Sequence, residues 1–119
     1  MITFEKVTVE NESVVKEMFK SHSLGEKKVQ YCVKVDDTYI GVIDYSVQEE
    51  RAVLSQLIIH FDYQGYGYGA NTYFTFEEMM KQRNVKEIKV LQEELTEKAK
   101  SFIESFSFTS EDEEYVKKI

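Results

Sequence analysis

The sequence predicts an α+β fold, a mixed but mainly antiparallel sheet flanked by helices in the order β-α-β-β-β-α-β-α-β. The first observation behind this prediction is a set of three strand-like runs at residues 30–35, 38–47 and 51–60, whose polar connections are too short for a crossover helix. The second is a pair of helical patterns on either side of another strand-like run at 87–91. An antiparallel meander followed by a helix-strand-helix segment is the arrangement that satisfies both.

The N-terminal part of the chain predicts a strand and a helix ahead of the meander. Residues 2–9 are rich in β-branched and aromatic side chains, which favours a strand. Asn11 is a residue type that caps helices, and apolar residues then recur at helical spacing. These residues are Val14, Val15, Met18 and Phe19. We therefore expect a short amphipathic helix that buries one face.

The C-terminal half predicts two helices and a last strand. A helix to about residue 84 is indicated by one apolar face, made of Ala70, Tyr73, Phe74 and Met80. A second amphipathic helix is indicated by Leu95, Ala99, Phe102, Ile103 and Phe106. A final strand is expected between residues 107 and 117, and the acidic run 111–114 is interpreted as a solvated turn.

Size and charge limit the classes of function. The 119 residues are expected to form one domain, 1–119, since proline and linker-like segments are missing from the sequence. A formal net charge of -7 argues against a nucleic-acid partner, which needs a clustered basic face. The same charge mildly favours cationic partners such as amines.

The cysteine, histidine and hydropathy patterns bear on compartment, membrane and metal. The single cysteine, Cys32, lies in a strand-like run and is interpreted as a small buried hydrophobe rather than a nucleophile. We expect a cytoplasmic protein, no membrane association and no metal site, because export signals, long apolar runs and ligand spacings are missing from the sequence. The oligomeric state stays open, and a homodimer is one of the states the sequence allows.

Three of the five glycines lie in residues 64–69, directly after the apolar run 57–59 and directly before a helix. Glycine permits positive φ and close approach of a ligand to the backbone. A strand, a glycine loop and a helix N-terminus together offer N–H donors to an anion such as a pyrophosphate. The alternative interpretation is a tight strand-to-helix turn without a ligand. The spacing fits neither a dinucleotide-binding loop nor a Walker loop.

The spacing does fit the pattern Q/R-x-x-G-x-G/A, here Gln64, Gly67 and Gly69. In this stretch the chain resembles the GNAT acyltransferases, which bind an acyl-CoA through a strand, a loop and a helix start, and the order of the surrounding elements is similar. The resemblance implies that strand backbone pairs with the pantetheine arm and that loop amides hold the pyrophosphate. The implied cofactor-binding residues are Leu57, Ile58, Ile59, Gln64, Gly65, Tyr66, Gly67, Tyr68, Gly69 and Ala70.

The resemblance is weaker at the positions that carry proton transfer. Many members have N-x-x-A-x-x-x-Y-x-x-x-G-F across the last helix, where this chain has Thr96, Ala99, Ile103, Ser107 and Phe108. Ile103 therefore replaces the tyrosine that protonates the departing thiolate, and it has no proton to donate. A glutamate base often precedes the pantetheine strand, and this chain has a glutamine, Gln56, there.

No catalytic residue is assigned from the sequence. His60 is either a functional group or a histidine at a strand end, and Asp44 faces either a substrate cleft or solvent. By resemblance, the expected activity is an N-acetyltransferase that moves an acetyl or short acyl group from acetyl-CoA or another acyl-CoA to a primary amine, by direct attack, on a small molecule or peptide. The alternatives are a non-catalytic acyl-CoA-binding or interaction module, and a structural domain with an incidental glycine turn.

Overall fold

The structure is a computed structural model that describes residues 1–22, 25, 27–92 and 95–119. Its sheet has seven strands in the order β1-β2-β3-β4-β5-β7-β6. Neighbouring strands are antiparallel except β4 and β5, which are parallel. The strands are β1 (Ile2–Lys6), β2 (Tyr31–Val35), β3 (Thr38–Gln48), β4 (Arg51–Ile59), β5 (Glu87–Leu91), β6 (Thr109–Glu111) and β7 (Glu114–Lys118). The predicted α+β class, with a mixed and mainly antiparallel sheet, is confirmed.

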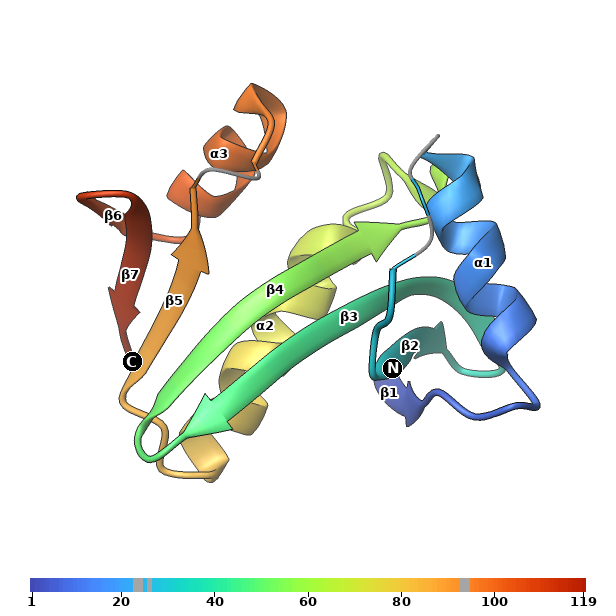
Figure 1. Ribbon diagram of the computed structural model, residues 1–119, viewed down its shortest axis with the longest axis horizontal. Coiled ribbons are helices and arrows are strands. Elements are labelled where there is room, and N and C mark those ends of the chain that lie inside the picture. The colour runs from blue at the N-terminus through green and yellow to red at the C-terminus, as the bar shows by residue number, and fades with distance from the viewer. Residues whose placement is uncertain (23–24, 26, 93–94) are drawn as a thin grey trace.

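The helices cover opposite faces of the sheet (Figure 1). They are α1 (Glu12–Ser21), α2 (Tyr68–Gln82) and α3 (Glu97–Glu104), with a short 3₁₀ turn, η1 (Phe61–Tyr63), ahead of α2. The cluster on the α1 face contains Val15, Met18, Phe19, Val29, Cys32, Val42 and Ile58. The larger core lies on the face covered by α2 and includes Val33, Ile40, Ile43, Tyr73, Phe76 and Met80. Each described helix is too short or too polar to cross a bilayer.

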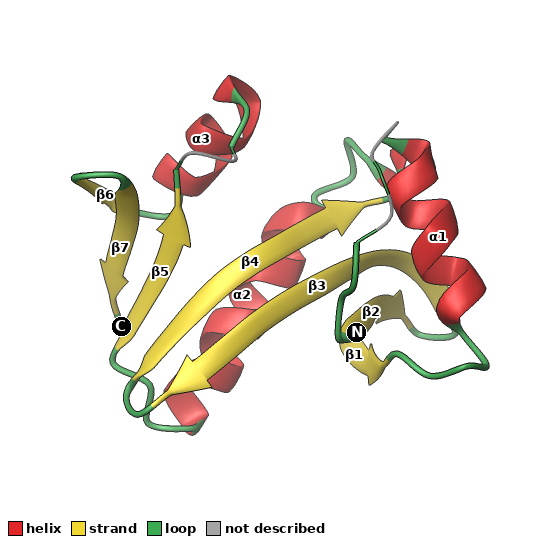
Figure 2. Ribbon diagram, in the orientation of Figure 1, coloured by secondary structure: helices red, strands yellow, loops and turns green. Residues whose placement is uncertain are grey.

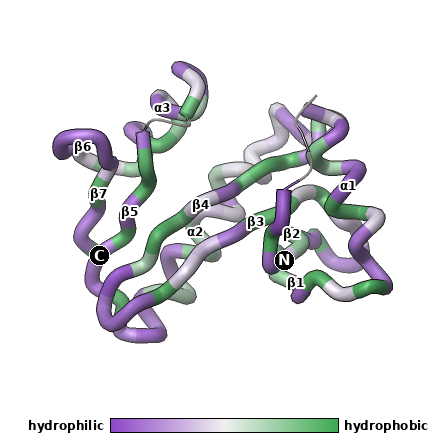
Figure 3. Tube along the Cα trace, viewed as in Figure 1, coloured by the Kyte–Doolittle hydropathy of each residue, from purple (hydrophilic) through white to green (hydrophobic). Residues whose placement is uncertain are grey.

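Hydrophobic patterning explains why these elements form. Successive residues of β3 alternate between the two cores, as Val42 faces α1 and Ile43 faces α2. The turn that joins β3 to β4 is hydrophilic, as Figure 3 shows, and its Glu49 has a φ of 58°. A polar turn between two apolar strands fixes the hairpin.

Two details of the C-terminal half differ from the sequence predictions. The predicted face of α2 included Phe74, but Phe74 is half exposed while Phe76 is fully buried, because the buried spacing runs Tyr73, Phe76, Glu77, Met80. The predicted last strand is a hairpin of two strands, β6 and β7. Asp112 makes the turn with a φ of 56°, a left-handed conformation that Asp tolerates better than most residues.

Asn11 occupies the N-cap of α1, as predicted, but its side chain makes no bond to the helix amides. It accepts a hydrogen bond from the Thr8 backbone N–H and donates to Glu5 at 2.8 Å. Tyr39 also donates to the Glu5 carboxylate. The hydrogen bond from Tyr39, and to a smaller extent the one from Asn11, lowers the pKa of Glu5. Asn11 therefore ties the start of α1 to β1.

Cys32 is fully buried between β1 and β3, and burial raises the pKa of its thiol to about 11. A thiol with such a pKa is almost entirely protonated near neutral pH, and only the thiolate is a strong nucleophile. The interpretation of Cys32 as a small buried hydrophobe is confirmed.

Glu77 joins α2 to the last strand. Its carboxylate is nearly buried, accepts a hydrogen bond from Tyr73 Oη at 2.8 Å, and pairs with Lys117 of β7 and Lys81 of α2. Burial alone would raise its pKa, but the hydrogen bonds from Lys117 and Tyr73 and the positive charges outweigh burial and lower the pKa. The ionised form of Glu77 is therefore part of the folded state.

This arrangement predicts an acid-sensitive contribution to stability. A carboxylate whose folded pKa lies below its ordinary value of 4.5 stabilises the fold above that pH and loses its contribution as pH falls through the folded pKa. Glu77→Gln should therefore be less stable than wild type at about pH 6, and should lose less stability on acidification to about pH 3, with differences on the order of 1 kcal/mol. Urea unfolding at the two pH values measures both.

The matched control is Glu78→Gln, which removes the same charge from the exposed side of the same helix. Its pH dependence should match that of wild type. If Glu77→Gln and Glu78→Gln lose stability in parallel on acidification, the ionised Glu77 is not a distinct contributor.

Candidate functional site

The two parallel strands at the centre of the sheet pair only at their beginnings. Residues Arg51 to Val53 of β4 pair with Glu87 to Lys89 of β5, and beyond these residues the strands diverge (Figure 2). The C-terminal half of β4 therefore has an edge that no described strand covers. Backbone polar groups alternate in direction along a strand. Because the His60 N–H donates to the Ile40 carbonyl of β3, the backbone groups of Leu57 and Ile59 face the uncovered edge.

A β-bulge at Ser55 accompanies the divergence. Asp44 of β3 pairs with Gln56, and the next residue of β3, Tyr45, pairs with Leu54, so Ser55 is the extra residue. The Ser55 hydroxyl lies 3.1 Å from the Asp44 carbonyl oxygen and 3.1 Å from Asp44 Oδ2. A bulge bends the strand and increases its twist. It therefore turns the second half of β4 away from β5, and nothing in the local sequence identified it.

The predicted glycine loop connects β4 to α2. Gly65 and Gly67 have φ values of 85° and 82°, in the left-handed region that other residues rarely adopt, and Gly67 is the N-cap of α2. A Cβ added to either glycine would meet no atom within 4 Å, so the space above them is open. None of the backbone N–H groups from Gly65 to Ala70 donates to another atom within the described residues. A row of unpaired amides at the start of a 15-residue helix is a physical basis for anion binding.

Gly69 lies beside α3. A Cβ at this position would make van der Waals contact with the ring of Phe102 in α3, at 3.4 Å. Tyr66 is exposed, with 73% of its surface accessible, and its ring lies 6.3 Å from that of Tyr68. The side chain of Tyr66 therefore lies mainly in solvent.

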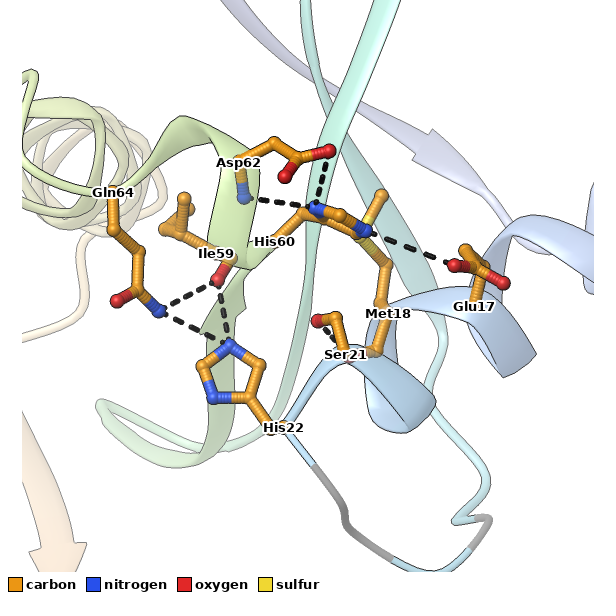
Figure 4. A network of polar contacts seen from close by, with 8 residues as sticks. All are labelled: Glu17, Met18, Ser21, His22, Ile59, His60, Asp62 and Gln64. Atoms are coloured by element: carbon orange, nitrogen blue, oxygen red, sulfur yellow. Dashed lines mark hydrogen bonds and ion pairs between the residues drawn. The ribbon is translucent and has the colours of Figure 1, made fainter.

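The Ile59 carbonyl is held by two side chains from distant parts of the chain. His22 Nε2, at the end of α1, lies 2.7 Å from this oxygen and Gln64 Nε2 lies 3.1 Å from it, and Figure 4 shows both pointing toward it. A carbonyl oxygen only accepts, so His22 Nε2 must carry a hydrogen. The 3.2 Å approach of the two nitrogens then brings two donors to one acceptor. We call this arrangement the carbonyl clamp.

Gln64 has a structural role in the carbonyl clamp. Its side chain points back to the strand, so the loop is fastened at its first residue. Residues 57–59 and 64–70, predicted from the sequence as the cofactor-binding set, thus form one continuous strand, loop and helix start. The part of His22 was missed, since 37 residues separate it from Ile59.

His60 faces α1 rather than the uncovered strand edge. Its Nδ1 accepts a hydrogen bond from the Asp62 backbone N–H at 3.0 Å, which caps η1. Its Nε2 lies 3.9 Å from Glu17 of α1 (Figure 4). Of the two interpretations left open by the sequence, this geometry supports a structural part. Across the described ranges, no three His, Cys, Asp or Glu side chains are grouped to hold a metal ion.

The last helix fits the pattern aligned from the sequence, although three residue types differ. Thr96 stands at the N-cap of α3 and its hydroxyl accepts a hydrogen bond from the Ala99 N–H. Ser107 has a φ of 70°, a conformation that suits the glycine of the pattern. Ile103 is only 5% exposed and packs in the main core. The place of the expected proton donor is therefore filled by a buried aliphatic side chain.

Two basic residues of the α2 region, Lys81 and Arg83, lie far from the glycine loop. They lie at the C-terminal end of α2, about 20 Å along the helix from its first residue, and Lys81 pairs with Glu77 at 3.6 Å. They are therefore remote from the glycine loop, as expected for surface residues.

Comparisons with known proteins agree with this geometry. A family model described as "Acetyltransferase (GNAT) family" matches residues 3–108. No curated protein sequence matches the chain. Among solved structures, an acetyltransferase from Thermus thermophilus is similar over 100% of this chain and 97% of its own, with 18% identity and a TM-score of 0.83.

Two further solved structures are similar in fold. A PaiA N-acetyltransferase from Thermoplasma acidophilum, solved in complex with coenzyme A, covers 100% of this chain and 99% of its own at 15% identity, with a TM-score of 0.74. Naa50 from Arabidopsis thaliana, in complex with the bisubstrate analogue CoA-Ac-MVNAL, covers 97% and 95% at 18% identity, with a TM-score of 0.68. At these identities the likenesses establish the fold.

The carbonyl clamp makes a prediction about coupling. His22→Ala or Gln64→Ala alone leaves the Ile59 oxygen one donor, so each should lower the free energy of unfolding by about 1 kcal/mol. The double variant leaves the oxygen without either donor and should lose about 1 kcal/mol more than the sum. Urea unfolding of the four proteins measures the coupling. His22→Ala combined with Thr96→Ala, which share no partner, should be additive, and additivity for the clamp pair would contradict the shared acceptor.

Proposed function

We propose that this chain, an acyl-CoA-dependent N-acetyltransferase that belongs to the acetyltransferase (GNAT) family, transfers an acetyl or other short acyl group from its CoA thioester to a primary amine by direct attack. The observation that carries the proposal is the combination of an uncovered β4 edge with a row of unpaired amides directly after it. One extended ligand with an anionic centre fits both features.

In this proposal the glycine loop binds the pyrophosphate. The N–H groups from Gly65 to Ala70 and the positive end of the α2 dipole supply donors and charge stabilisation. The open space over Gly65 and Gly67 is where the phosphates lie. Acetyl-CoA is the proposed acyl donor.

The pantetheine arm pairs with the uncovered edge of β4. Leu57 offers both its N–H and its carbonyl, and Ile59 offers its N–H, because the Ile59 carbonyl is occupied by the carbonyl clamp. Ile58 turns its backbone groups toward β3, so within the predicted set it contributes packing rather than pairing. The arm thus pairs with the part of β4 that β5 leaves unpaired.

The acceptor amine attacks the thioester carbonyl as a neutral nitrogen. The carbon–nitrogen bond forms, the carbon–sulfur bond breaks, and the proton lost by the amine ends on the departing thiolate, so the products are an amide and free CoA. Neither Ile103 nor Gln56 can exchange a proton near neutral pH, so positioning supplies much of the rate and water carries the proton.

Binding of acetyl-CoA is the first test. A ligand that binds only the folded state, present at about 100 times its dissociation constant, adds about 2.7 kcal/mol of stability, which raises the melting temperature by roughly 10 °C for a domain of this size. Gly67→Val should abolish the rise, since its side chain fills the open space and disfavours a φ of 82°. Thermal unfolding with and without acetyl-CoA measures both.

Two controls keep the test specific. The melting temperature of ligand-free Gly67→Val separates a loss of stability from a loss of binding. Gly25→Val places the same side chain where an added Cβ meets no atom within 4 Å and should keep the full rise. A flat wild-type response, or a full rise in Gly67→Val, would overturn the site. Release of free CoA with a panel of amines and peptides then distinguishes an enzyme from a module that binds without turnover.

A further inference from the structure

Asp44 is a carboxylate at the point where β4 leaves β5. It lies on β3 opposite the bulge, half-buried, and its two oxygens accept hydrogen bonds from the Gln30 backbone N–H at 3.0 Å and from the Ser55 hydroxyl at 3.1 Å. A carboxylate has about four acceptor sites. Asp44 is therefore held in one orientation by two donors and can still accept from another.

The Asp44 side chain lies on the face of the sheet opposite α2. Val42 and Ile58 pack toward α1, so Asp44 and Gln56, two residues away on the same strands, share that face. The bulge brings the Ser55 side chain to the same face, as its bond to Asp44 requires. Figure 1 shows α1 and the segment 27–30 in front of the end of this face near β2, and no described helix in front of the middle of β3 and β4. Asp44 is half-buried, so part of its surface remains accessible to an incoming molecule.

The neighbouring carboxylates on this face are neutralised. Glu87 pairs with Arg51 at 2.8 Å, and Glu114 pairs with Lys89 at 3.1 Å. Asp44 makes no ion pair with any described residue. It is the negative charge at the bulge without a cationic partner, in a chain whose net charge of -7 attracts cations.

The proposed acyl donor would bring its thioester to this place. A donor fixed at the glycine loop runs back along the β4 edge from Ile59 toward Gln56, a distance of about 10 Å for three residues of strand, which an extended pantetheine arm spans. The amine must approach from a side that the arm and α2 do not cover. The face that carries Asp44 is that side.

We propose that Asp44 binds the ammonium form of the acceptor amine and so selects cationic amines as substrates. The bound ammonium loses one proton to water before the neutral nitrogen attacks the thioester, and the second proton ends on the departing thiolate. The inference rests on the proposed function and deepens it, since it names the class of acceptor and the residue that recognises it. Ser55 and Gln30 orient the carboxylate, and Gln56 beside it adds a neutral polar group that does not compete for the charge.

Two small amines of similar shape test the charge. At about pH 7.5 ethylamine is an ammonium ion, while trifluoroethylamine is mainly neutral because its fluorines withdraw electrons. Asp44→Asn keeps the shape and the acceptor oxygen for Gln30 but removes the charge. Its KM for ethylamine should rise on the order of tenfold, while its KM for trifluoroethylamine and for acetyl-CoA should stay at the wild-type values. Rates of CoA release at saturating acetyl-CoA give each KM.

The matched control is Glu50→Gln, which removes one charge from an exposed position on the same hairpin and should change neither KM. If Asp44→Asn changes the KM for both amines equally, or changes neither KM, Asp44 does not recognise the ammonium group. Turnover by the wild type would still support the proposed function in that case. A wild type that binds acetyl-CoA but acylates neither amine would also overturn it. A wild type that shows no melting shift with acetyl-CoA would overturn the proposed function itself.

Discussion

The divergence of β4 from β5 is the constraint on which the rest of the molecule depends. A parallel pair that continued to the strand ends would satisfy every backbone group of β4 and leave no edge for a ligand. The extra residue at Ser55 prevents this by twisting the strand just after its pairing with β5 ends. The uncovered edge, the direction in which the glycine loop leaves the strand and the position of the half-buried carboxylate of Asp44 all follow from that one insertion.

The networks on either side of the divergence hold the helices without entering it. Asn11 and Glu5 fasten α1 to the first strand, and Glu77 with Lys117 fastens α2 to the last. Both networks use charged or amide groups that are paired, so burial is compensated. Within the described part of the chain, neither of these two networks reaches the bulge at Ser55.

The sequence predicted what depends on local spacing. Short polar connections identified the meander, and Gln64, Gly67 and Gly69 identified the loop, because turn chemistry and glycine clustering are visible within a few residues. Long-range contacts were not accessible in this way. The bulge depends on the register between two strands. The contact of Gly69 with Phe102 and the contact of His22 with Ile59 each join residues that are distant in the sequence, 37 residues apart in the second case. On α2 the sequence pattern predicted Phe74 to be buried, whereas Phe76 is the buried residue, because the predicted apolar face was rotated about the helix axis.

The brevity of the parallel ladder has a mechanical consequence. Strands β1 to β4 form a series of antiparallel neighbours, and β5 to β7 form another. Among the described residues, the ladder that joins the two series spans three residue pairs, and beside it the Lys86 and Glu87 N–H groups donate to the Glu50 carbonyl. A partial, reversible separation of β4 from β5 meets the least resistance at this short ladder. Helix α2 connects the two groups of strands along the chain. A ligand lying along the β4 edge would lie between the two groups of strands and would make this separation less frequent. Amide hydrogen exchange in β5 would then slow on binding, although the ligand contacts lie on β4 and the loop.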